Sequence, residues 1–326
     1  MNATAADPAE LASSPRKSGA GADRAFQLIT AGAAWLVLLL LGGVAVSMAW
    51  GGRLAFKTFG WHFVTGKDWD VVGGKFGAFV PIYGTLVTSA IALMIAVPVS
   101  IGIALFLTDI APRWTRGPIA IAIELLAAIP SIIYGMWGLF VFAPFMAAHV
   151  EPWLSGHFGN KPLIGPLFSG PPIGIGMLTA GIVLGIMVIP FISSVAREVF
   201  SAVPAPLKES AVALGSTRWE ILSRVTLPYT RSAVIGAIFL GLGRALGETM
   251  AVTFVLGNAH DLSASLLMPS NSIAAAIANE FTEADTDLYR SSLIALGFLL
   301  FVVTFVVLTI AKLMLLRLNR QLGRTH

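Results

Sequence analysis

Two residues of opposite charge lie inside one long apolar stretch of the sequence. Residues 241–252 read GLGRALGETMAV, and between Ser232 and Leu256 the only charged residues are Arg244 and Glu248. A guanidinium presents a planar fork of N–H donors that matches the oxygens of phosphate and carboxylate groups. A spacing of four places both side chains on one face of a helix, where they can also pair. The stretch therefore allows either an anion site or a buried ion pair that fixes helix packing.

The composition indicates which solvent surrounds this stretch. The chain has 326 residues, of which 56% are hydrophobic and only 12% are charged, about half the charged fraction of a soluble domain. A helix needs about 20 apolar residues to cross a bilayer. Long runs contain no Asp, Glu, Lys or Arg: Ala25–Gly52, Phe76–Thr108, Leu125–Val150, Pro162–Ala196 and Ser291–Ala311. We therefore predict an all-α polytopic membrane protein.

Six transmembrane helices are predicted. The first is longer than the apolar core of a signal peptide, so we expect it to be retained. The Ala/Ser-rich residues 1–24 are interpreted as a flexible cytoplasmic tail before a membrane domain at 25–326. Pro98, Pro130 and Pro190 fall inside predicted helices, where proline causes a bend. The predicted spans are Leu28–Trp50, Thr85–Leu107, Ile119–Phe145, Ile175–Ala196, Ser232–Leu256 and Ser292–Leu315.

The basic residues between the spans indicate the orientation. Six crossings put both termini on one side, and most loop Lys and Arg residues, among them Arg113, Arg116, Arg197 and Lys208, fall on that side. Loops rich in Lys and Arg stay in the cytoplasm. Both termini are therefore predicted to be cytoplasmic, in a plasma or inner membrane. This distribution explains the net charge of +4, and no nucleic-acid partner is expected.

The longest loop on the predicted cytoplasmic side contains ESAVALGSTRWEILSRVTLPY, Glu209–Tyr229. Pro206 suits the first turn of a short helix, and Gly215 suits the left-handed residue that follows its end. Thr217 and Glu220 have the spacing of a capping box, so a second helix is expected there, and Pro228 is expected to end it.

Apolar residues within this loop are too many for a solvated linker. They are Val212, Leu214, Trp219, Leu222 and Val225. Side chains of this kind gain free energy when they leave water. The loop is therefore expected to bury one face against another protein, or, in the simpler alternative, against the membrane surface.

The same loop resembles the EAA loop of ABC-transporter permease subunits. Glu209, Ala211, Gly215, Leu227 and Pro228 follow the pattern E-x-A-x3-G-x11-L-P, with Ser210 where the family usually has Ala. In that family the loop docks into a groove of a separate ATPase subunit. The resemblance implies that these five residues take part in ATPase coupling, within a docking loop at 204–229.

Longer stretches are similar to the PstC-type permease subunits of phosphate importers. They include FGAFVPIYGTLVTS, LLAAIPSIIYGMWGLFVF and GLGRALGETMAVTFVLGN, and the resemblance runs from about Phe76 to the C-terminus. It implies the type I ABC importer permease fold and transport of inorganic phosphate. It also implies a homologous PstA-type permease subunit, an ATPase dimer and an extracytoplasmic phosphate-binding protein as partners. The chain itself is then no enzyme and has no cofactor.

Arg244, Glu248 and Glu124 are the candidate residues of the substrate path. A charge at the bilayer centre costs at least ~2.5–3.5 kcal/mol, so charged residues there face the bundle interior or a water-filled path. We expect Arg244 to bind the anion. We expect Glu248 to hold the guanidinium while the path is empty and to compete with the anion when it is full. Glu124 has either a path role or a packing and surface role.

Other motifs indicate no chemistry. GGKFG at Gly73–Gly77 has Phe76 where a phosphate cradle needs a hydroxyl. The chain has no Cys, and the external His62, His149, His157 and His260 lack the spacing of a metal site, so all four are predicted to be surface residues.

The external segment Ser270–Phe281 is predicted to form one short helix. It either offers a docking place to a delivery protein or packs against neighbouring spans. Besides a non-transporting membrane scaffold or sensor, which would tolerate loss of both Arg244 and Glu248, two transport alternatives for the whole chain stay open at this point. One is an importer of another oxyanion, molybdate or sulfate. The other is an ion-coupled secondary transporter that uses Glu248 and Glu124.

Overall fold

The computed structural model describes residues 20–322, so most of the predicted tail at 1–24 lies outside the described residues. The chain divides into two units, Met1–Trp50 and Gly51–His326. Helix α1 (Ala20–Gly51) supplies the described residues of the first unit. Within the described part, six helices are long and apolar enough to cross a membrane, as predicted: Asp23–Gly51, Phe79–Ile110, Ser131–Phe158, Met177–Ser201, Arg218–Leu246 and Asp287–Arg317.

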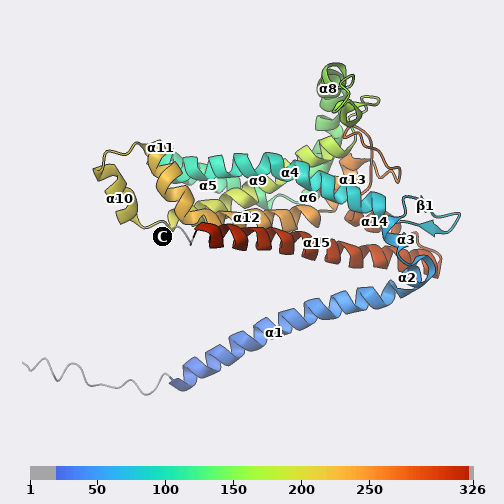
Figure 1. Ribbon diagram of the computed structural model, residues 1–326, viewed down its shortest axis with the longest axis horizontal. Coiled ribbons are helices and arrows are strands. Elements are labelled where there is room, and N and C mark those ends of the chain that lie inside the picture. Colours follow the sequence, from blue (N-terminus) through green and yellow to red (C-terminus); the bar gives the residue numbers. More distant parts are fainter. Residues whose placement is uncertain (1–19, 323–326) are drawn as a thin grey trace, which may run out of the picture. The chain divides into compact units, whose positions relative to one another are not determined.

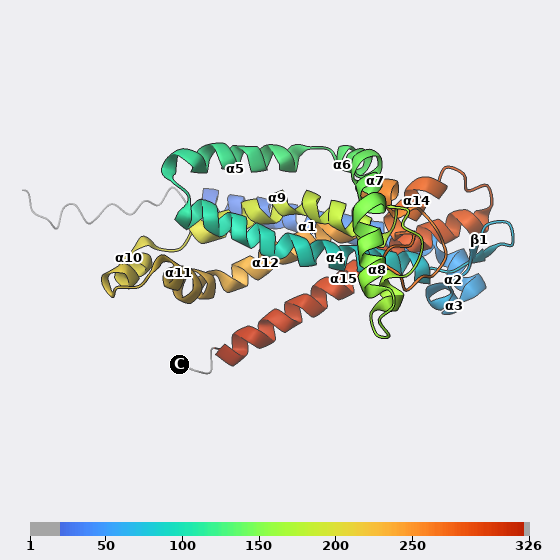
Figure 2. The ribbon, with the colours of Figure 1, turned by 90° about the horizontal axis from the view of Figure 1, so that it is seen from above.

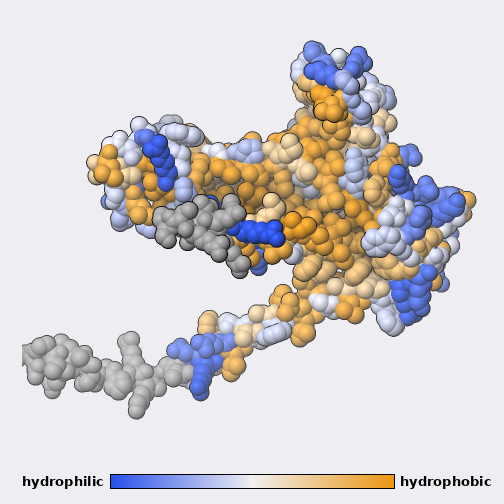
Figure 3. All heavy atoms as spheres, in the orientation of Figure 1, coloured by the Kyte–Doolittle hydropathy of each residue, from blue (hydrophilic) through white to orange (hydrophobic). Residues whose placement is uncertain are grey.

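The second unit is built on long helices that run side by side (Figures 1 and 2). They are α4 (Phe79–Leu105), α5 (Arg113–Ala128), α9 (Met177–Ser201), α12 (Leu227–Leu246) and α15 (Asp287–Leu322). Helix α9 packs against α4, α5 and α12. Hydrophobic atoms cover the middle of these helices, and hydrophilic atoms gather at the two ends of the unit (Figure 3). This banding suits a bilayer around the middle of the bundle.

The contact between α4 and α9 forms the main core. Small residues of α4, Ala92 and Ala96, and larger ones of α9, Val183 and Leu184, are completely buried there. The Ser100 hydroxyl of α4 donates a hydrogen bond of 3.0 Å to the Ile189 carbonyl of α9. Pro98 and Pro190 lie inside these two helices, as predicted. Close packing at this contact makes α9 the element against which the others are positioned.

The predicted span Ile119–Phe145 is wrong as a single helix. Helix α5 ends at Ala128, Ile129 is extended, and Pro130 precedes a new helix. A residue before proline is driven out of the helical conformation, which explains the break. The chain then turns away from the direction of α5 in both views (Figures 1 and 2). This segment comprises α6 (Ser131–Trp137), η3 (Gly138–Phe142), α7 (Ala143–Phe145), η4 (Met146–Val150) and α8 (Glu151–Phe158).

One end of the second unit, the hairpin end, carries a two-stranded antiparallel hairpin in which Trp69 pairs with Phe76. The predicted helix in Ser270–Phe281 is confirmed as α14, capped by the Ser272 hydroxyl and buried along Ile273–Ala276. The burial favours packing over docking for this segment. The elements of this end are α2 (Arg53–Phe59), α3 (His62–Thr65), β1 (Trp69–Asp70), β2 (Lys75–Phe76), η5 (Gly165–Phe168) and α14 (Ile273–Glu280).

The opposite end, the loop end, carries the two short helices α10 (Ala205–Ala213) and α11 (Arg218–Ile221) (Figure 1). Two π-helical turns flank them in space, η2 (Phe106–Ile110) after α4 and η6 (Leu222–Thr226) before α12. The short helix α13 (Met250–Leu256) follows α12 and packs against α6 and α9.

Candidate functional site

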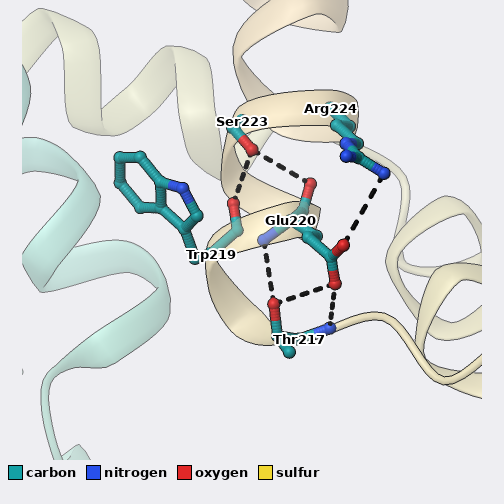
Figure 4. A network of polar contacts seen from close by, with 5 residues as sticks. All are labelled: Thr217, Trp219, Glu220, Ser223 and Arg224. Carbon is teal, nitrogen blue, oxygen red and sulfur yellow. Dashed lines mark hydrogen bonds and ion pairs between the residues drawn. The ribbon is translucent and has the colours of Figure 1, made fainter.

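The segment that joins α10 to α11 forms as its local sequence predicts. Pro206 lies in the first turn of α10, and Gly215 has a φ of 82°, the left-handed conformation that glycine adopts after a helix end. Thr217 and Glu220 form both hydrogen bonds of a capping box (Figure 4). The Glu220 amide donates to the Thr217 hydroxyl at 3.3 Å, and the Thr217 amide donates to the Glu220 carboxylate at 2.9 Å. The predicted pair of helices is confirmed.

Large apolar side chains of this loop stand in solvent. Leu214 is 87% exposed, Trp219 70% and Val212 60%. In Figure 4 the Trp219 indole extends away from the Thr217–Glu220 network. The described chain leaves these three residues uncovered, so the face against another protein stays a prediction; apolar patches left exposed on a folded surface mark interaction sites. Leu222, by contrast, is buried within the chain.

Pro228 does not end the second helix, so that prediction is wrong. The helix continues from α11 through the π-helical turn η6 into α12, with Pro228 in the first turn of α12. The Leu227 amide bonds to the Leu222 carbonyl, five residues earlier. This wider turn just before the proline accommodates the ring, which would collide with a normal α-helical turn. The loop is therefore joined to α12 by continuous helix.

An ion pair ties α10 to the end of α4. The Lys208 ammonium lies 2.7 Å from the Asp109 carboxylate of η2, and the two side chains are only 22% and 20% exposed. Of the other predicted coupling residues, Glu209 and Pro228 are exposed, Ala211 is buried and Leu227 is partly buried. The sequence interpretation missed this contact because Lys208 and Asp109 are 99 residues apart.

Glu124 pairs with an arginine of the neighbouring helix. Its carboxylate accepts a hydrogen bond of 2.6 Å from the Arg197 guanidinium, which joins α5 to α9. Ser193 and Ser194 line a small cavity beside the pair. The Glu124 side chain is 55% exposed, so the contact stabilises the chain by about 1 kcal/mol or less.

Arg244 and Glu248 do not share a continuous helix. The predicted span Ser232–Leu256 is interrupted: α12 ends at Leu246, Gly247 is its C-terminal cap, and α13 begins at Met250 after Thr249. Arg244 lies in the last turn of α12, while Glu248 lies in the break. Gly247 and Thr249 are favoured at helix ends and starts. This Gly-Glu-Thr signal was hidden in the sequence by the apolar residues on both sides.

The expected pairing of Glu248 with Arg244 is also wrong. Within the part of the chain that the structure describes, no carboxylate lies within ion-pair distance of the Arg244 guanidinium. A Glu248 oxygen instead accepts a hydrogen bond of 3.3 Å from the Ala251 amide of α13. Arg244 is exposed on the surface of the chain, with its guanidinium carbon 5.7 Å from the centre of the Phe191 ring.

A glycine sets the distance between α12 and α9 beside this site. A methyl group on Gly241 would lie 2.5 Å from the Ile192 side chain, closer than side chains approach. Gly243 and Gly247 have no such close neighbour. Gly241 therefore allows α12 to approach α9 closely, and Phe191 is the residue next to the contact.

The hairpin end carries a polar network centred on Glu280. Its carboxylate accepts hydrogen bonds from Trp69 at 2.8 Å and Tyr289 at 2.7 Å, and it lies 2.8 Å from His260 Nε2. His260 stacks on Trp69 and is only 22% exposed, so its prediction as a surface residue is wrong. Although burial acts to raise it, the hydrogen bonds hold the pKa of Glu280 below its ordinary value.

Comparison of the sequence with protein families identifies the family to which the chain belongs. Residues 96–320 match the model of a family described as binding-protein-dependent transport system inner membrane components. The matched range includes the loop end, the Arg244 break and most of the second unit's long helices. The chain belongs to this family. It is a membrane permease subunit and not an enzyme.

Proteins that match this permease over at least 90% of their own length are named as phosphate transport permeases. A protein of Xylella fastidiosa (strain Temecula1 / ATCC 700964) named phosphate transport system permease protein PstC is 62% identical over 304 residues, which cover 93% of this chain and 94% of the relative. The protein of that name in Mesorhizobium japonicum is 56% identical over 92% of both chains. A probable one in Methanocaldococcus jannaschii is 36% identical over 86% and 90%.

Solved structures support the fold of the permease. One chain of a bacterial alginate ABC transporter, crystallised with an alginate pentasaccharide-bound periplasmic protein, aligns with a TM-score of 0.60 over 93% of this chain and 98% of its own length. A second crystal structure of a bacterial alginate ABC transporter aligns with a TM-score of 0.54. Both are 20% identical in sequence. The predicted all-α type I ABC importer permease fold is thereby confirmed.

Proposed function

We propose that this permease is one membrane subunit of an ATP-driven phosphate importer, and that phosphate passes Arg244 on its way across. The observation that carries this proposal is the state of Arg244. Its guanidinium lies in an apolar helix that is interrupted three residues later, it is exposed on the chain, and its fork meets no carboxylate of the described residues. The names of the relatives supply the anion.

The chemistry of the site suits a tetrahedral oxyanion. The planar guanidinium can bind two oxygens at once through parallel N–H donors, and such charge-assisted hydrogen bonds are about twice as strong as neutral ones. A charged arginine within a span is retained where it faces protein or a water-filled path. We therefore propose that the exposed face around Arg244 meets a homologous PstA-type subunit, with the path between the two chains.

The loop end would receive the driving force from a separate ATPase dimer. Leu214, Trp219 and Val212 supply exposed apolar contact area, and the continuous helix through η6 links them to α12, which carries Arg244. The excess of basic residues on the loop side favours a cytoplasmic position for it. Both termini then lie in the cytoplasm, and an extracytoplasmic phosphate-binding protein delivers the anion at the hairpin end.

Glu248 and Glu124, which the sequence suggested as residues of the substrate path, have other roles in this proposal. Glu248 caps the start of α13, so Glu248→Gln is expected to preserve assembly and to change the rate of uptake by loosening the break. Glu124 is engaged with Arg197, and we assign it to the packing of α5 on α9.

Replacement of Arg244 tests the proposal. Arg244→Ala should abolish ATP-dependent phosphate uptake by the assembled importer, while Arg244→Lys, which keeps the charge but loses the fork, should reduce it about tenfold. Arg231→Ala, the other arginine of α12, is the matched control and should transport normally. Co-purification of the partner subunits reports assembly. Normal uptake by an assembled Arg244→Ala importer, or uptake of sulfate or molybdate in place of phosphate, would contradict the proposal.

A further inference from the structure

The Arg244 guanidinium is held by an aromatic ring. Its central carbon lies 5.7 Å from the centroid of the Phe191 ring, within the range at which the negative face of an aromatic ring attracts a cation. The carboxylate expected to perform this task, Glu248, bonds to the Ala251 amide. The Phe191 ring is thus a group that the structure places against this cation.

The ring is itself fixed in position. Phe191 follows Pro190 in α9 and packs, partly buried, against the core formed by α4, α9 and α13. Its neighbour Ile192 meets Gly241 of α12 at close range. Because this contact sets the distance between the two helices, a ring on α9 and an arginine one turn further along α12 have a defined separation.

A ring and a carboxylate hold a guanidinium in different ways. A carboxylate accepts hydrogen bonds from the N–H fork, the same donors that an oxyanion needs. The face of a ring attracts the charge but accepts none of those in-plane bonds, so the fork stays free for an incoming anion. The attraction is also weaker than a charge-assisted hydrogen bond, which lets the guanidinium move with its substrate.

We propose that Phe191 is a positioning residue for anion passage, which keeps the Arg244 guanidinium in place with its N–H fork open while the path is empty. This inference rests on the proposed function of Arg244. It assigns to a ring on α9 the task that the sequence pattern had suggested for Glu248.

A graded series of rings tests the inference. In the complete importer, reconstituted in proteoliposomes with ATP and saturating phosphate-loaded binding protein, Phe191 is replaced by mono-, di- and trifluorophenylalanine. Fluorine weakens the negative face with little change in size. The initial rate of phosphate uptake should fall stepwise, by about 2- to 5-fold at the end of the series. Phe191→Leu should be at least as slow, and Phe191→Tyr, which keeps the ring, should approach the unsubstituted rate.

Phe254 provides the matched control, because it is a partly buried ring packed against the same core. The same fluorinated series at Phe254 should leave uptake unchanged. A flat or rising series at Phe191, or equal slopes at the two positions, would overturn the inference. If the unsubstituted importer moves no phosphate, the proposed function fails; if it does and the Phe191 series is flat, only the role of the ring fails.

Discussion

The two ends of the second unit differ in whether their key side chains find partners within the chain. At the hairpin end, the Glu280 carboxylate receives hydrogen bonds from three surrounding side chains above a buried aromatic core. At the loop end, Leu214 and Trp219 are 87% and 70% exposed. The Glu280 carboxylate is thus paired within one chain, although Val72 and Trp61 of the same end are 99% and 78% exposed. The loop end exposes apolar side chains that the described chain does not cover, and this is where we propose that a partner attaches.

A charge introduced into the exposed α10–α11 loop should have the largest effect of the changes considered, and the affected quantity is binding of the ATPase. Leu214→Glu puts a carboxylate into the proposed ATPase contact, and loss of a central apolar contact of this kind costs about 2 kcal/mol or more. Retention of the ATPase on the purified permease should fall at least about 30-fold. Leu163→Glu, at a loop leucine that is 90% exposed outside the loop end, is the control. Equal retention by both variants would remove the distinction between the two sites.

At the hairpin end, Glu280→Gln should weaken the chain locally. A glutamine amide cannot accept all the hydrogen bonds that the two carboxylate oxygens receive, and a buried donor left without a partner costs about 1–3 kcal/mol. Hydrogen exchange of the β1–β2 and α14 amides should rise about 5- to 150-fold while α10 and α11 stay unchanged. Faster exchange at the loop end as well would mean that the two ends are not independent.

Acid should reproduce this effect at the same place. The pKa of Glu280 is lower in the folded chain than in the unfolded chain. Its contribution to stability is therefore present above the ordinary carboxyl pKa of about 4.3 and is lost as the pH falls through the lowered folded value. Thermal unfolding of the permease in detergent from pH 6 to pH 3 should show this loss. Glu280→Gln should be flatter over that range, and an identical profile would contradict the assignment.

A smaller effect is expected from the ion pair of α10 with η2. Lys208→Asp removes a partly buried contact of about 1 kcal/mol and places two acids together. Uptake per ATP hydrolysed should fall about fivefold, because the end of α4 no longer follows the loop. The exchanged pair, Lys208→Asp with Asp109→Lys, should recover most of it. Failure of the exchange to recover coupling would limit this contact to local packing.

The same contrast separates what the sequence could predict from what it could not. Caps are local, so Pro206, Gly215 and the Thr217–Glu220 box were predicted correctly. The break at Gly247 was missed and the break at Pro130 was predicted only as a bend, because apolar composition continues across both, although each carries a residue that favours a helix end.

Contacts between segments far apart in the chain could not be predicted from the sequence. Spacing alone does not indicate that Lys208 meets Asp109 or that His260 meets Glu280, because these pairs depend on how the helices pack. The same holds for Arg244, whose residue type and apolar surroundings predicted a special role while its ring partner on α9 came only from the fold.

Crosslinking tests the central proposal, that a separate ATPase binds this permease at the α10–α11 loop. The chain contains no cysteine, so Leu214→Cys and Leu163→Cys each introduce one thiol at an exposed leucine. In native membranes, a short thiol-to-amine crosslinker should join position 214, and not position 163, to the ATPase subunit. A crosslink from position 163 with none from position 214 would contradict the account.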